Sequence, residues 1–234
     1  MEDVPKPFFD HLEELRKRIF YCLAAVVLGL LISYQFIDKI LFFISKPVGN
    51  FIFIQPMEAF MVRLKIALVS GVLLTMPFIL IQIWRFILIA LTPKEKNSLF
   101  WILPSSYILF MMGFSLGLFL LVPLAIKFLL SYGSGVLVPQ ISIDAYISFL
   151  GMICLTLGGI FQMPLLTFFL AKLGVLSWET LSEKRKIAVL VIYIASSLLT
   201  PGPDPISSLL LALCSYLLYE CSILTAKLAA KQTV

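Results

Sequence analysis

The chain has 234 residues, of which 61% are hydrophobic and only 13% are charged, and its formal net charge is +5. Soluble globular proteins average about 25% charged and about 45 to 50% apolar residues, so an ordinary water-soluble domain is excluded. The basic residues stand in short clusters beside long apolar blocks and form no broad patch, which argues against nucleic acid as a partner.

Six segments are apolar over a length that suits a membrane span, since a helix needs about 20 apolar residues to cross a hydrocarbon core of about 30 Å. In chain order they cover residues 19–36, 59–91, 99–130, 145–170, 187–199 and 206–226. Helices are expected, because backbone groups in lipid must be paired within the segment and the alternation of a barrel strand is missing. The sequence therefore predicts an all-α membrane protein with a single six-span transmembrane domain over residues 1–234.

Lysine and arginine gather on one side of a six-span arrangement. The groups at 16–18, 94–96, 184–186 and 227–231 fall on that side, whereas Lys39 and Lys46 fall on the other. Because basic residues favour the cytoplasmic side, both termini are expected to be cytoplasmic. The apolar stretch at 40–44, between the first two spans, is too short to cross and is expected to be an interfacial cap on the outer face.

The fifth span is unusually short. Its 13 residues, 187 to 199, reach only about 20 Å as a helix, well below the hydrocarbon thickness. Spans two to four are longer and contain prolines, each of which removes a backbone hydrogen bond and is expected to kink its helix. These prolines are Pro77, Pro104, Pro123 and Pro164. We therefore expect kinked long helices beside a short hairpin of spans five and six, together forming a concave wall.

Catalytic and metal-binding patterns are missing from the sequence. The only histidine, His11, precedes the first span, so neither a serine–histidine pair nor an H-E-x-x-H helix can lie in the membrane. No G-x-x-x-x-G-K-[ST] phosphate loop occurs, and the four cysteines form no C-x-x-C pair. We therefore expect a protein that is not an enzyme and that holds no metal or cofactor.

Three polar features remain as candidates for function. The segment before the first span is expected to begin a helix at Asp10 as N-cap, with acids and then bases, which is also typical of a solvated amphipathic lead-in. Glu95 is the only acid of the turn 92–96, where an ordinary solvated charge is equally typical. Gln162 lies well inside span four and either satisfies its own kinked helix or hydrogen-bonds a neighbouring one.

Several motifs, in the same order, resemble those of the TatC family, the multi-span subunit of the twin-arginine protein translocase. The run His11-Leu12-Glu13-Glu14-Leu15-Arg16 is similar to the family's N-terminal signature, and residues 56–60, the Glu95 turn, residues 161–164 and the turn 200–204 fit as well. The resemblance covers essentially the whole chain. It implies a core receptor subunit that binds signal peptides of folded cargo proteins and recruits single-span subunits of the TatA and TatB type for gradient-driven export.

The resemblance also implies which residues bind the signal peptide. Glu14 and Glu95 would receive the two guanidinium groups of the twin arginines, with Arg16 and Phe86 in the same cytoplasmic site. The chemistry suits this role, because a carboxylate accepts a planar guanidinium through two parallel hydrogen bonds whereas lysine offers a point charge.

For the partner subunits, the resemblance implies contact sites at Gln162, Thr200 and Ser208. The family can carry a glutamate where this chain has Gln162, so a mechanism that needs an ionisable group there is in doubt, while one that needs a hydrogen bond is not. The resemblance further implies a multi-pass membrane protein, in contact with lipid, that associates with further copies of itself in the assembled complex. A bacterial or archaeal plasma membrane and a thylakoid membrane both stay open, and the lack of a transit-like N-terminal pattern favours a prokaryotic plasma membrane.

Two other functions remain open on the residues alone. A small-solute secondary transporter needs paired polar groups near the bilayer midplane and usually an internal repeat, and the sequence shows neither. A membrane assembly scaffold has no sequence pattern that would exclude it, and the binding of peptides would separate it from a receptor.

Overall fold

A computed structural model describes residues 8–45, 51–52, 54–88, 99–132, 140–200 and 204–231. Within that part of the chain the structure consists of helices, their connections and one isolated parallel β-bridge between Ile52 and Ser142. The chain divides into two compact units, residues 1–43 with 63–107 and residues 44–62 with 108–234. Each unit therefore joins segments that are far apart in the sequence.

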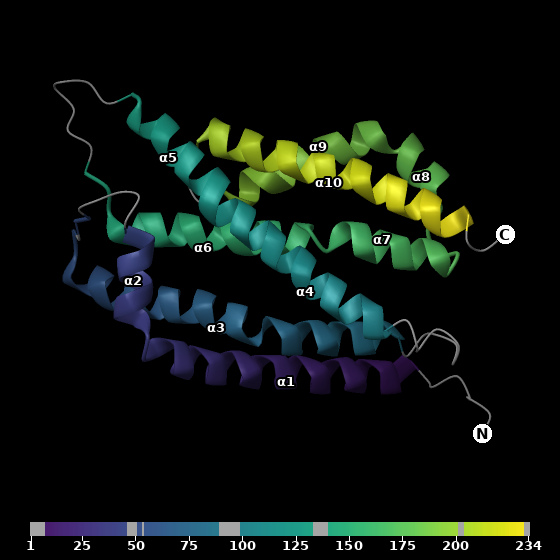
Figure 1. The fold of residues 1–234 in the computed structure, drawn as a ribbon, viewed down its shortest axis with the longest axis horizontal. Helices are drawn as coiled ribbons and strands as arrows, with labels where there is room; N and C mark the ends of the chain where they lie inside the picture. The colour runs from purple at the N-terminus through teal and green to yellow at the C-terminus, as the bar shows by residue number, and fades with distance from the viewer. Residues whose placement is uncertain are drawn as a thin grey trace. The chain divides into compact units, whose positions relative to one another are not determined.

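The first unit is centred on an antiparallel pair of helices, α1 (Phe8–Tyr34) and α3 (Pro56–Leu88), which lie side by side in Figure 1. Their backbones approach closely at Gly29 and Gly71, where a Cβ atom added to Gly71 would lie 2.6 Å from the backbone nitrogen of Leu30. Small residues let two membrane helices come together in this way. The pair of glycines fixes the register in which α1 meets α3.

The two ends of α1 differ from the prediction. The helix begins at Phe8, so Asp10 lies inside it and the prediction of an N-cap at Asp10 is wrong. At its other end α1 stops at Tyr34, and α2 (Ile37–Ser45) turns away from it by 78°. The short apolar stretch at 40–44 therefore does not continue α1.

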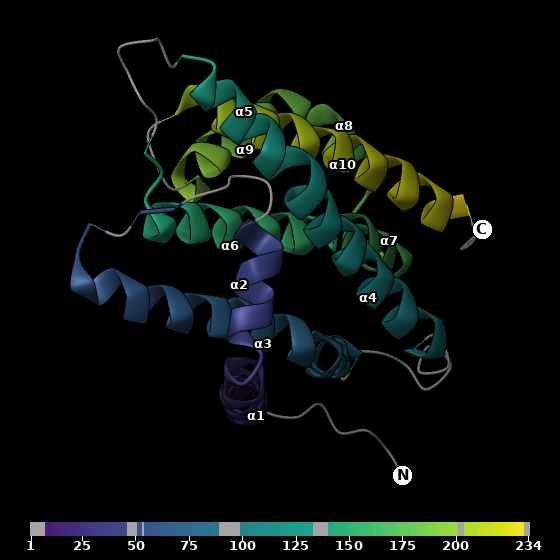
Figure 2. The same ribbon diagram turned by 60° about the vertical axis from the view of Figure 1, so that its left-hand side comes forward.

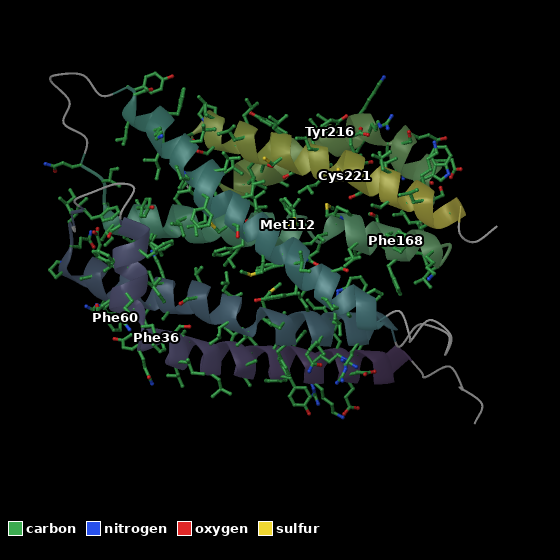
Figure 3. The ribbon with its side chains drawn as sticks, viewed as in Figure 1. Phe36, Phe60, Met112, Phe168, Tyr216 and Cys221 are labelled. Atoms are coloured by element: carbon green, nitrogen blue, oxygen red, sulfur yellow. The ribbon has the colours of Figure 1, made fainter. Side chains whose placement is uncertain are left out.

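Most of the remaining helices belong to the second unit, into which α4 (Leu99–Leu116) leads from the first. In chain order they are the π-helical segment η2 (Gly117–Leu121), α5 (Val122–Leu130), α6 (Ile143–Ile160), α7 (Met163–Lys172), α8 (Trp178–Glu183), α9 (Arg185–Leu199) and α10 (Pro205–Lys231). The long helix α10 packs along α7 on one side and α9 on another, as Figures 1 and 2 show. Phe168 of α7, labelled in Figure 3, packs against a small buried cluster of Ala171, Ala226 and Ala229.

The four internal prolines do not act alike. Pro77 and Pro104 lie inside α3 and α4, which continue through them without interruption. Pro123 lies in the first turn of α5, directly after the π-helical segment, and Pro164 lies in the first turn of α7, after a turn at Phe161 and Gln162. A proline is favoured in the first turn of a helix. At Pro123 the helix continues with a change from π-helical to α-helical hydrogen bonding, whereas at Pro164 a turn interrupts the helix before a new one starts.

The start of α6 is tied to the ends of α2 and α3 by polar contacts. A carboxylate oxygen of Glu58 accepts hydrogen bonds from the backbone N–H of Ile54 at 3.0 Å and from the hydroxyl of Ser142 at 3.5 Å. The hydroxyl of Tyr146 donates to the carbonyl of Ile44 at 3.1 Å. These contacts hold together residues that are up to 102 positions apart in the chain.

Helices occupy all six of the segments that the sequence analysis marked as spans. In the described part of the chain, four helical stretches are long and apolar enough to cross a membrane, namely α3, α4 through α5, α6 with α7, and α10. The bent pair of α1 and α2 makes a fifth when the two helices are counted together as one broken span. The remaining helix, α9, has 15 residues, which reach about 22 Å. It is two residues longer than the 13 predicted and still shorter than the hydrocarbon thickness.

Candidate functional site

The first candidate site lies on the early turns of α1, where Glu14 and Arg18 are one turn apart. A terminal nitrogen of Arg18, Nη2, donates to Oε1 of Glu14 at 2.7 Å. The other terminal nitrogen, Nη1, donates to α3 at Gln82, to the backbone carbonyl at 3.3 Å and to side-chain Oε1 at 3.2 Å. The two side chains are sheltered, with 16% of Arg18 and 25% of Glu14 exposed. Glu14 is therefore a partly buried carboxylate that already binds a guanidinium.

The neighbouring charges on α1 are much more open to solvent. Lys17 pairs with Glu13 at 3.2 Å, and both side chains are more than half exposed. Arg16 is also exposed. An exposed pair at this helical spacing contributes about 0.3 to 0.5 kcal/mol, whereas a sheltered, charge-assisted hydrogen bond contributes about 1.5 to 3 kcal/mol. Of the two acids in this turn, Glu14 is thus the one placed to bind a cation firmly.

Phe86 lies on α3 one turn beyond Gln82, and its side chain is half-buried. Residues four apart share a helix face, so Phe86 and the Arg18 contact lie on the same side of α3. Glu95, the second predicted acid, lies outside the described residues, as does the side chain of His11. Of the four predicted signal-peptide residues, the structure thus describes the side chains of Glu14, Arg16 and Phe86.

A buried contact fixes the end of α3 that carries Phe86 against α4. The indole nitrogen of Trp84 donates to the hydroxyl of Ser106 at 3.0 Å, and both side chains are buried. A buried indole N–H needs such a partner, because leaving it unpaired costs free energy. The sequence analysis did not single out this pair, since a serine and a tryptophan in apolar helices look like ordinary packing residues.

In the second unit, Gln162 stands in the turn between α6 and α7. Its backbone N–H donates to the carbonyl of Gly159 at 3.0 Å, and its own carbonyl accepts from Leu166 at 3.0 Å. The side chain is half-buried and makes no capping hydrogen bond to α7. The residue therefore stands where the helix ladder is interrupted, and its backbone groups bridge the break.

Thr200 and Ser208, predicted as partner contacts, are both buried. The hydroxyl of Thr200 donates to the carbonyl of Ser196 at 2.7 Å, and that of Ser208 donates to the carbonyl of Asp204 at 2.9 Å. The Asp204 carboxylate in turn accepts the backbone N–H of Ser207 at 2.9 Å and so caps the first turn of α10. These hydroxyls are already used within the ends of α9 and α10.

A third polar group joins α9 to α10 and was missed by the sequence analysis. The guanidinium of Arg185, at the start of α9, contacts the carboxylate of Glu220 on α10 at 2.9 Å. The hydroxyl of Tyr216, labelled in Figure 3, donates to the same carboxylate at 2.9 Å. The two charges are 35 positions apart, so the sequence signals them only through their placement at facing ends of neighbouring spans.

The described residues contain no cluster of three or more histidine, cysteine, aspartate or glutamate side chains that could hold a metal ion. What the two sites offer instead is a sheltered carboxylate on α1 and a set of helix ends in the second unit where hydroxyl, amide and charged groups meet. Carboxylate, hydroxyl and amide groups in such places can form hydrogen bonds with a peptide or with a neighbouring helix.

Comparison with known proteins gives consistent matches over nearly the whole chain. The family model described as Sec-independent protein translocase protein (TatC) matches residues 10–213. A protein of that name from Carboxydothermus hydrogenoformans is 41% identical over 231 residues, which cover 97% of this chain and 95% of the relative. The protein of the same name from Aquifex aeolicus is 34% identical, and the match covers 97% of each chain.

A solved structure agrees with these matches. It is described as the crystal structure of the twin-arginine translocase receptor TatC, and it is similar to this chain with a TM-score of 0.86 and 34% sequence identity. The similarity covers 94% of this chain and 99% of that chain.

Proposed function

The chain belongs to the TatC family of Sec-independent protein translocase proteins, and from this premise we propose that it binds twin-arginine signal peptides at the cytoplasmic face of a prokaryotic plasma membrane. As a member of that family it is a multi-pass membrane protein and a core component of the twin-arginine translocase, not an enzyme. Its own residues then have two tasks, to recognise the signal and to recruit the other subunits.

The proposed topology has six spans in one transmembrane domain, with both termini in the cytoplasm. The one-sided distribution of lysine and arginine supports this orientation. The sixth span in the count is α9, whose 15 residues fall short of the hydrocarbon thickness. Local thinning of the bilayer accommodates so short a helix. A concave wall of the long helices would then face the signal peptide.

Glu14 and Glu95 are the proposed receivers of the two signal-peptide arginines, with Arg16 and Phe86 beside them. The observation that carries this proposal is the sheltered guanidinium contact of Glu14 with Arg18, because it demonstrates that the carboxylate accepts such a group at 2.7 Å. Two open surface pairs would add only about 0 to 1 kcal/mol each, too little for useful affinity. The partial burial of Glu14 strengthens its contact with a guanidinium. Apolar contact between the helices and the hydrophobic segment of the signal peptide adds further binding free energy.

The partner subunits are proposed to dock with their single helices at α7 and at the short hairpin of α9 and α10. Gln162 offers a side-chain amide at the break before α7. Because Thr200 and Ser208 are buried, we assign them the task of holding the hairpin's end in shape, while the exposed side chains of Leu198 and Leu209 beside them contact the partner. A transmembrane helix packs on such a surface by close contact with apolar and small residues.

The experiment that tests signal recognition is the binding of a fluorescent twin-arginine peptide to the full-length protein in detergent. A twin-lysine peptide serves as the ligand control. We expect Glu14→Gln and Glu95→Gln each to weaken binding by about tenfold or more, since each removes a charge-assisted contact. Glu13→Gln is the matched control, because Glu13 is the adjacent acid and is 55% exposed in its pair with Lys17.

Equal affinity for the arginine and lysine peptides would contradict the proposal. So would affinities in the Glu14→Gln and Glu95→Gln variants that match the Glu13→Gln control. Helix docking is tested separately, by disulfide cross-linking from a cysteine at position 198 to a single-span partner.

A further inference from the structure

The carboxylate proposed to receive an arginine from the signal peptide already binds an arginine of the protein itself. Glu14 and Arg18 are one turn apart on α1, and the contact between them is sheltered. We propose that Arg18 is an internal stand-in for the signal-peptide arginine: it occupies Glu14 at rest, the incoming guanidinium must displace it, and this competition selects arginine over lysine. The inference rests on the proposed role of Glu14 in signal binding.

Arg18 forms a hydrogen bond with only one of the two carboxylate oxygens of Glu14. Arg18 contacts one oxygen, Oε1, through one terminal nitrogen, Nη2. Among the described residues no hydrogen bond reaches the other oxygen, Oε2. A guanidinium that binds a carboxylate through two parallel hydrogen bonds needs both oxygens. Each carboxylate oxygen can accept more than one hydrogen bond, but two guanidinium groups on one sheltered carboxylate repel each other. An incoming arginine therefore forms the stronger, two-point contact with Glu14 by taking the place of Arg18 at Oε1.

Arg18 keeps its hydrogen bonds to Gln82 of α3 when it releases Glu14. Its other terminal nitrogen, Nη1, is already held by two acceptors on Gln82, the backbone carbonyl at 3.3 Å and the side-chain oxygen at 3.2 Å. Its Nε atom is buried and has no partner among the described residues, so the resting arrangement leaves one donor of Arg18 unused. Both features lower the cost of displacement, because Arg18 keeps contacts on α3 and gives up an incompletely satisfied position.

The same competition discriminates against lysine. An ammonium group is a point charge that approaches one carboxylate oxygen at a time, so it gains no second parallel hydrogen bond with which to outcompete Arg18. Because Arg18 is only 16% exposed, water does not substitute for it at Glu14 as it would on an open surface. An arginine of the signal peptide therefore displaces Arg18 from Glu14, whereas a lysine does not.

The helix supplies a matched control for charge. Lys17 is the adjacent residue, carries the same charge and pairs with Glu13 in an exposed contact. Arg18→Gln and Lys17→Gln thus remove the same charge one residue apart. In full-length protein, we expect Arg18→Gln to bind the twin-arginine peptide about three- to tenfold tighter, with a larger gain for the twin-lysine peptide. Lys17→Gln is expected to change either affinity by less than about twofold.

A second variant tests the contact between Arg18 and Gln82, and its expected effect on the affinity for the twin-arginine peptide is opposite to that of Arg18→Gln. Gln82→Met keeps the size of the side chain and removes its oxygen, so Arg18 relies more on Glu14 and the twin-arginine peptide is expected to bind about two- to fivefold more weakly. The same substitution in an Arg18→Gln background is expected to have no effect. Should Arg18→Gln fail to fold, unchanged binding in the Gln82→Met variant overturns the inference.

The outcomes separate this inference from the function on which it rests. If Glu14→Gln leaves twin-arginine binding unchanged, the carboxylate assignment and the stand-in role of Arg18 fall together. If Glu14→Gln weakens binding but Arg18→Gln weakens it too, or acts like Lys17→Gln, the receptor site stands and the stand-in role alone is overturned. A narrowed ratio of twin-arginine to twin-lysine affinity in Arg18→Gln supports the inference.

Discussion

Replacement of Gly71 by alanine is expected to force α1 and α3 apart. The added Cβ would lie 2.6 Å from the backbone nitrogen of Leu30 and 2.9 Å from the carbonyl carbon of Gly29, and these are backbone atoms that no rotamer change can move. Ordinary contact begins at about 3.4 Å, so the helices must separate by about 0.8 Å, the difference between 3.4 and 2.6 Å. Overpacking of this kind costs about 1 to 3 kcal/mol.

Gly159→Ala provides the control for this prediction. A Cβ added to Gly159, in α6, meets nothing within 4 Å, so the substitution is expected to be neutral or slightly stabilising through the helix propensity of alanine. The assay is unfolding of the purified protein in mixed micelles of increasing denaturing detergent, followed by tryptophan fluorescence. Equal midpoints for Gly71→Ala, Gly159→Ala and the unsubstituted protein would refute the close crossing of α1 and α3.

Three smaller effects follow from single polar contacts. Asp204→Ala removes the cap of α10 and is expected to destabilise the protein by about 1 kcal/mol, with Asp204→Ser close to neutral, as measured in the same unfolding assay. Thr225→Val removes a hydroxyl that lies 3.0 Å from the carbonyl of Pro164 on α7 and 2.9 Å from the carbonyl of Ser222 in its own helix. The substitution is expected to cost about 0.6 kcal/mol, so a loss above about 2 kcal/mol would contradict this contact energy. Glu220→Gln weakens the exposed pair with Arg185 and is expected to cost less than about 1 kcal/mol, and a double-mutant cycle with Arg185→Gln would measure the pair itself.

The helical segments could be predicted from the sequence because each depends on local composition. The apolar segment at 187–199 corresponds to α9, Arg185–Leu199, with its start displaced by two residues. The apolar part of the first span was expected from residue 19, with an amphipathic helical lead-in from Asp10, and α1 begins at Phe8, two residues before that expected start. Polar residues can lead into a span without ending the helix.

The effects of the prolines could be predicted only in part. A proline lacks its N–H wherever it occurs, but the sequence does not state whether the helix continues around it or restarts. At Pro77 the helix continues, whereas at Pro164 a turn precedes the proline and a new helix begins. The difference depends on which neighbouring groups satisfy the freed backbone atoms, and this is a property of tertiary contacts.

At the candidate site, too, the sequence predicts local features but not the contacts between segments that are far apart in the chain. The acids of α1 were recognised from their motif. Nothing in the motif indicates that the pair of Glu14 and Arg18 is largely shielded from solvent, whereas the pair of Glu13 and Lys17 is exposed. That distinction depends on Gln82, which lies 64 positions from Arg18 and reaches it only because α1 and α3 cross at their glycines. A single sequence contains no signal for such a register.

The most direct test of the proposed recognition is photo-cross-linking from position 86 in membrane vesicles. With benzoylphenylalanine in place of Phe86, which is half-buried on α3, we predict a cross-link to a twin-arginine signal peptide that disappears in the Glu14→Gln variant. The same label in place of Phe36, which is 50% exposed near the opposite end of α1, is predicted to give no cross-link near the arginines. Equal labelling from positions 86 and 36, or a cross-link from position 86 that persists without the Glu14 carboxylate, would contradict the account.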